Sequence, residues 1–154
     1  MNIINSGIVG NQWDTFWESE AVPLVGKPKP VLILSTQFSD ASREAEQLNA
    51  IINGGCKLNA ESYNLKMIPA GQKVAWHMLK QTYQPKVVLL FDIYPAQLGV
   101  SALFRLNDIN NFDKAIWVPT ISLAQLADNK EVKSAFWNNA LKLIFVNKQF
   151  GEIV

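Results

Sequence analysis

The sequence predicts an α/β protein in which a central, mainly parallel sheet is covered by helices on both faces. The runs VLILS at 31–35 and KVVLLF at 86–91 are apolar throughout, as expected of strands buried on both faces. Between these runs, apolar residues recur at helical spacing. Because strands that alternate with helices form parallel sheets, we expect one three-layer α/β/α domain with about four strands. This domain spans residues 29–154 and follows an N-terminal arm, residues 1–28.

Two further strands complete the expected sheet, and a helix follows the first strand. Residues 115–118 form a third apolar run, and residues 64–69 are a weaker strand candidate. The helix after the first strand is predicted to end at Gly54–Gly55, and Ser39 or Asp40 is its expected N-cap. Its apolar stripe consists of Ala41, Ala45, Leu48 and Ile52.

Prolines and capping boxes mark the later helices. A helix over residues 71–84 is expected to end at Pro85, and Pro95 suits the first turn of a short helix. Residues 101–111 are predicted to form a loop with some helix. The capping boxes that predict two helices after the third strand are Ser122-x-x-Gln125 and Asp128-x-x-Glu131.

Composition excludes several classes of function. The chain has 154 residues, of which 49% are hydrophobic and 18% charged, and its formal net charge is +1. A nucleic-acid binder usually carries clustered Lys and Arg, so we expect at most weak binding of nucleic acid. The sequence shows neither a secretory signal nor an apolar run of about 20 residues, which predicts a cytoplasmic protein without a membrane partner.

The sequence carries no motif for a metal or a cofactor, and none is predicted. The single cysteine, Cys56, cannot form an internal disulfide or a Cys-rich metal site, and we expect it to be an unreactive, half-buried residue. HExxH, CxxC and GxGxxG are absent. The only histidine, His77, lies within a predicted helix, away from any strand end. No catalytic residue is therefore assigned.

The candidate ligand cleft lies where the strands end, because open α/β sheets bind ligands at the carboxyl ends of their strands. The residues at these ends that we expect to line the cleft are Thr36, Gln37, Asp92, Val118 and Thr120. A carboxylate such as Asp92 could act as a base or a metal ligand. It could equally cap the short helix that begins at Pro95.

The N-terminal arm contains three aromatic residues at helical spacing. Trp13, Phe16 and Trp17 fall on one face of a short helix. Two interpretations stay open. The aromatic side chains could cover the edge of the domain's own core, or they could anchor a partner protein, since Trp and Phe are frequent at interface hot spots.

The C-terminal third contains a strand that ends in Val118-Pro119-Thr120, followed by a Lys133-x-x-x-Trp137 helix after Asn129. This arrangement resembles the closing unit of the uracil-DNA glycosylase superfamily, and the resemblance implies a glycosylase-like fold over residues 30–145. In that family a histidine occupies the Val118 position and an acid activates water at the position of Thr36. The resemblance therefore implies a protein without glycosylase activity.

The same region contains the run Ser122-Leu123-Ala124-Gln125-Leu126, followed by Asn129 and Trp137. This segment resembles the ending of the psi subunits of bacterial DNA polymerase III, a branch of this fold without the active site. The expected function is therefore non-catalytic protein binding, as in a replication accessory subunit. The alternative is an enzyme, a small-ligand binder or a nucleic-acid binder that uses the same cleft with different residues.

Overall fold

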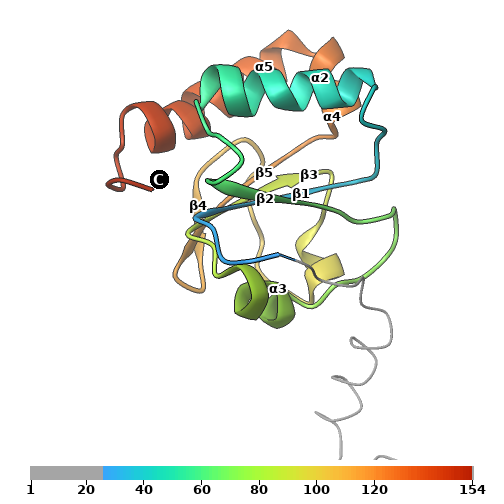
Figure 1. The fold of residues 1–154 in the computed structure, drawn as a ribbon, viewed down its shortest axis with the longest axis vertical. Helices are drawn as coiled ribbons and strands as arrows, with labels where there is room; N and C mark the ends of the chain where they lie inside the picture. Colours follow the sequence, from blue (N-terminus) through green and yellow to red (C-terminus); the bar gives the residue numbers. More distant parts are fainter. Residues whose placement is uncertain (1–25, 154) are drawn as a thin grey trace, which may run out of the picture.

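A five-stranded sheet forms the centre of the computed structural model, which describes residues 26–153 (Figure 1). In chain order the described elements are β1 (Val31–Ser35), α2 (Arg43–Asn49), the π-helix η1 (Ala50–Gly55), β2 (Tyr63–Met67), α3 (Trp76–Tyr83), β3 (Val87–Phe91), the 3₁₀ helix η2 (Pro95–Leu98), β4 (Asn110–Phe112), β5 (Ala115–Thr120), α4 (Leu123–Asp128), α5 (Lys130–Phe136) and the π-helix η3 (Trp137–Val146). The strand order is β2-β1-β3-β5-β4. All neighbouring strands are parallel except β4 and β5. The predicted α/β class and mainly parallel sheet are confirmed.

The three strong apolar runs form the middle of this sheet. Ile33 of β1 pairs with Leu89 of β3, which in turn pairs with Val118 of β5. Every residue of these three strands is buried, which explains why their sequences show no polar alternation. Strand β5 continues two residues beyond the predicted end. Its Pro119 lies past Trp117, the last β5 residue paired with β4, where the missing N–H interrupts no ladder to that strand.

The fifth strand was not predicted. Residues 101–111 were expected to form a loop with some helix, but Asn110–Phe112 pairs with β5 as a short antiparallel edge strand. A two-residue turn joins the strands, and both of its residues, Asp113 and Lys114, have positive φ (50° and 63°). Tight hairpin turns need such backbone, which usually selects Asn-Gly or Asp-Gly. The signal was therefore weak, because the strand is short and the turn lacks glycine.

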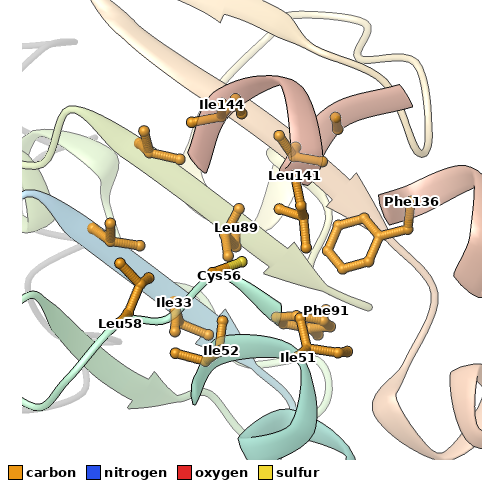
Figure 2. Packing of buried hydrophobic residues seen from close by; sticks show 14 of the residues in the cluster. Ile33, Ile51, Ile52, Cys56, Leu58, Leu89, Phe91, Phe136, Leu141 and Ile144 are labelled. Atoms are coloured by element: carbon orange, nitrogen blue, oxygen red, sulfur yellow. The ribbon is translucent and has the colours of Figure 1, made fainter. Parts of the chain in front are cut away.

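Helices cover both faces of the sheet. In Figure 1, α2, α4 and α5 lie on one face, and α3 lies on the other. Each face has its own apolar core. The first core contains Phe91 and Phe136, whose rings meet edge to face with centroids 5.6 Å apart (Figure 2). The second contains Trp76 and Trp117, with ring centroids 4.5 Å apart. Burial of such aromatic side chains contributes about 1.5–3 kcal/mol each.

The helix caps confirm one prediction and correct two. Ser122 and Gln125 form the predicted capping box of α4. The cap of α2 is Ser42, whose hydroxyl accepts from the amide of Ala45, and neither Ser39 nor Asp40 takes this place. Helix α5 is capped by Asn129, one residue beyond the predicted Asp128. Ser, Asp and Asn are nearly equivalent caps, so sequence alone does not choose between neighbours.

Candidate functional site

A cleft of about 300 Å³ lies at the carboxyl ends of the central strands. In the sheet, β2 lies on one side of β1, while β3 and β5 lie on the other side. The strand order therefore reverses between β1 and β3. Such a switch point is where open α/β sheets bind ligands, because the loops that leave neighbouring strands diverge there. The polar residues that line the cleft are Ser35, Thr36, Gln37, Glu44, Asp92 and Ser122.

The structure brings together three of the five predicted cleft residues. Thr36 and Gln37 follow β1, Asp92 follows β3, and all three line the cleft. Val118 does not line it, because its side chain is fully buried in the core cluster that contains Phe91 and Phe136. Thr120 is also buried, and its hydroxyl donates a hydrogen bond of 2.6 Å to Oδ1 of Asn107.

Asp92 adopts an unusual backbone conformation at the end of β3. Its φ is 59°, in the left-handed region that Asp tolerates better than most residues. The backbone amide of Asp92 donates to the carbonyl of Thr120, which fixes the chain as it leaves the sheet. Its Oδ1 accepts from the hydroxyl of Tyr94 over 3.1 Å, and this bond raises the pKa of the tyrosine. Asp92 therefore does not cap η2, whose N-cap is Tyr94.

Sequence reasoning missed two polar residues of the cleft, Glu44 and Ser122. Glu44 lies in the first turn of α2, and Ser122 caps α4. Their positions could have been found from the rule that helices following parallel strands begin at the carboxyl edge of the sheet. With Asp92, the cleft offers two carboxylates, and no Lys or Arg is among its described lining residues. It can accept hydrogen bonds from a ligand, whereas a phosphate would meet like charge.

The single histidine and the single cysteine, residue types that often serve in catalysis, both lie away from the cleft. His77 is exposed on α3, on the opposite face of the sheet from α2 and α4 (Figure 1). Cys56 is buried in the core near Leu58, and this burial raises the pKa of its thiol to about 12 (Figure 2). Within residues 26–153, no group of three or more His, Cys, Asp and Glu could hold a metal ion.

A loop beside β5 is ordered by side-chain hydrogen bonds and exposes two leucines to solvent. Asn110 is buried, and its side-chain amide spans the loop: Oδ1 accepts from the amide of Arg105 over 2.9 Å, and Nδ2 donates to the carbonyls of Arg105 and Asp108. The side chains of Leu103 and Leu106 are nevertheless 98% and 56% exposed. We call residues 103–110 the leucine loop.

The predicted partner-binding residues of the arm, Trp13, Phe16 and Trp17, lie outside the described residues. Over the range 26–153, no helix is both long enough and apolar enough to cross a bilayer. No protein-family model matches the chain, and the search of curated proteins found no match. The fold and the cleft therefore define an α/β protein with a polar, acidic cleft at the switch point of its sheet.

Proposed function

We propose that this chain is a non-catalytic protein with a three-layer, uracil-DNA glycosylase-like fold, and that it acts by binding another protein. The leucine loop supplies one contact. A replication accessory subunit is the class of protein that the sequence resemblance suggests for this role.

The observation that carries the proposal is the leucine loop. Exposed leucines are common singly, but here the backbone that carries them is already ordered by Asn110 and by the hydrogen bond from the amide of Asn107 to the carbonyl of Pro119. Ordering a loop before binding removes part of the entropic cost of association. Leu103 and Leu106 therefore offer apolar area to a partner at low cost.

The residues in the two catalytic positions of the resemblance support the non-catalytic part of the proposal. Thr36 lines the cleft where the family's acid would activate water, and a hydroxyl cannot act as that base at neutral pH. Val118 lies where a histidine would stabilise the departing base, and it is buried in the core. Loss of preorganised charge stabilisation costs about 10²–10³ in rate per group.

The binding proposal is tested by affinity capture from the source organism with the double variant Leu103→Glu/Leu106→Glu. The matched control is Val146→Glu/Phe150→Glu, which places two glutamates at apolar residues that are 51% and 41% exposed in the C-terminal part of the chain. We expect the wild type and the control to retain the same protein in stoichiometric amount, and the double variant to lose it with an unchanged melting temperature. Equal capture by all three proteins contradicts the proposal.

The absence of glycosylase activity is tested separately. Purified protein is incubated with single- and double-stranded DNA that contains uracil, and abasic sites are measured. We expect none above the level of a buffer control. Uracil release that follows the protein through purification, and that falls on substitution of Thr36 or Asp92, would overturn the non-catalytic assignment.

The cleft favours a second candidate function, the binding of a small ligand with hydrogen-bond donors. Glu44 and Asp92 are two acceptors at one cleft, and the strained backbone of Asp92 is the kind of feature that gathers at binding sites. Calorimetric titration with nucleobases, polyamines and basic amino acids tests this function. Binding should be lost in Asp92→Asn and kept in Glu61→Gln, which lies at the other edge of the sheet.

A further inference from the structure

A groove of about 560 Å³ lies at the amino edge of the sheet, opposite the cleft. It runs between α3 and the turn that joins β4 to β5. Its lining includes Trp76, Lys80, Gln81, Gln84, Asp113 and Lys114. The groove is shallow and carries aromatic, amide and cationic groups, together with the carboxylate of Asp113, which pairs with Lys80. These groups suit a peptide segment that combines aromatic side chains with acids.

Charge is distributed unevenly between this domain and the arm. All fourteen Lys and Arg residues fall within residues 26–153, together with ten of the thirteen acids, which gives that range a formal net charge of +4. Residues 1–25 hold the other three acids and no Lys or Arg, a formal net charge of −3. Several of the cations gather at the amino edge of the sheet. The lysines at this edge include Lys27, Lys29, Lys57, Lys86 and Lys114, against the acid Glu61, while Lys80 pairs with Asp113. Of these lysines, Lys80 and Lys114 line the groove.

The arm joins the domain at the end of α3, where the carbonyl of Lys27 also accepts a hydrogen bond from Nδ2 of Asn64 in β2. Gly26 has a φ of +136°, and a Cβ there would lie 3.0 Å from Cε1 of Tyr83, so the chain is packed closely against the end of α3. The amide of Lys29 donates to the carbonyl of Tyr83. Gln84, the next residue after Tyr83, lines the groove. Five residues separate Glu20 from Gly26, and such a linker spans up to about 17 Å.

We propose that residues 13–20 of this same chain dock into the groove, with Trp13, Phe16 and Trp17 on its apolar floor. Asp14, Glu18 and Glu20 then face the lysines of its rim. The short tether gives the arm a high effective concentration at the groove, so that weak contacts suffice. This contact goes beyond the proposed function: the leucine loop, at the other edge of the sheet, stays open to a partner while the arm is docked.

The full chain, with a nitroxide spin label on Thr15→Cys in a Cys56→Ala background, tests this contact by NMR. We expect the label to reduce the amide signal intensities of His77, Gln81 and Lys114, and to leave those of Thr36 and Leu103 unchanged. The triple variant Trp13→Ala/Phe16→Ala/Trp17→Ala should abolish the loss of intensity. Lys114→Glu should weaken it, while Lys142→Glu, the same charge reversal on η3, should not.

Two outcomes overturn the proposal. Signal loss that is absent, or that centres on the cleft or the leucine loop, shows that the arm does not occupy the groove. Docking of the arm from a second copy is tested with a mixture of two proteins. One carries the spin label and no ¹⁵N, and the other carries ¹⁵N and no spin label. Loss of intensity in this mixture that matches the loss within one chain would assign the groove to the arm of a second copy. Melting temperatures of all variants confirm that the domain is folded.

Discussion

The indole Nε1 of Trp76 donates a hydrogen bond of 2.8 Å to Oδ2 of Asp113, while Nζ of Lys80 binds the other oxygen over 3.0 Å. This carboxylate joins α3 to the turn between β4 and β5, and so connects a helix to the edge of the sheet. Both bonds favour the ionised form. The bond from Trp76, followed by the bond from Lys80, holds the pKa of Asp113 below its ordinary value of 3.8.

The variant Asp113→Asn should lower stability in a pH-dependent way. Because the folded pKa of Asp113 is lowered, its stabilisation is present above pH 3.8 and is lost as pH falls through the folded pKa. Asparagine tolerates the left-handed backbone of this turn, so the change isolates the charge. Melting curves from pH 3 to 7 should show a constant difference above pH 5 that shrinks toward pH 3. A difference that grows on acidification contradicts the assignment.

The Gly54–Gly55 pair in η1 offers a matched test of packing between the two π-helices. A Cβ added at Gly54 meets nothing within 4 Å, whereas one at Gly55 lies 3.0 Å from Cζ3 of Trp137. We expect Gly54→Ala to stabilise the protein by about 0.4–1 kcal/mol, since alanine restricts the unfolded chain. Gly55→Ala should destabilise it, because the indole must shift. Urea unfolding of both variants provides the measurement, and equal effects would show that η1 and η3 are not packed as described.

The central strands could be predicted because burial on both faces leaves a continuous apolar run in the sequence. Turn-forming residues on either side of these runs mark where the strands begin and end. Strand β4 could not be predicted, because three residues such as Asn110–Phe112 carry too little pattern to separate a strand from a loop. The cleft was predicted in part for a similar reason. Thr36, Gln37 and Asp92 follow strands directly, whereas Glu44 and Ser122 line the cleft from the beginnings of helices α2 and α4. Val118 was assigned to the cleft because the predicted strand ended there, but β5 continues to Thr120 and leaves Val118 inside the strand.

The thiol of Cys56 should be inert in the folded protein. Burial raises its pKa from 9.0 to about 12, so the reactive thiolate is scarce near neutral pH. Ellman's reagent at pH 8 should react with Cys56 only after denaturation. The raised pKa also makes stability fall as pH rises above 9, since the unfolded thiol ionises first. The variant Cys56→Ala should show a smaller decline between pH 9 and 11. Rapid labelling of native protein would contradict the burial.

The leucine loop should lose its order in variants of Asn110. The side-chain amide of this buried residue makes hydrogen bonds to Arg105, to Asp108 and, over 3.4 Å, to the carbonyl of Trp117, so its removal takes a partner from one amide and three carbonyls. Asn110→Ala is therefore expected to destabilise the protein by about 1–3 kcal/mol, because the carbonyl of Trp117 is buried and water can reach the part-buried groups of the loop. Asn110→Asp should be at least as harmful, since its carboxylate would face those carbonyl oxygens.

Thr120→Val provides the graded control for this prediction. It removes one bond, from Thr120 to Asn107, and should cost about 0.5–1.5 kcal/mol while the rest of the loop stays ordered. Hydrogen exchange separates the two cases. The amide of Arg105, which donates to Oδ1 of Asn110, should exchange rapidly in Asn110→Ala and remain protected in Thr120→Val. If the amide of Arg105 stays protected in both variants, Asn110 does not order the loop, and its side chain does not preorganise Leu103 and Leu106 for a partner.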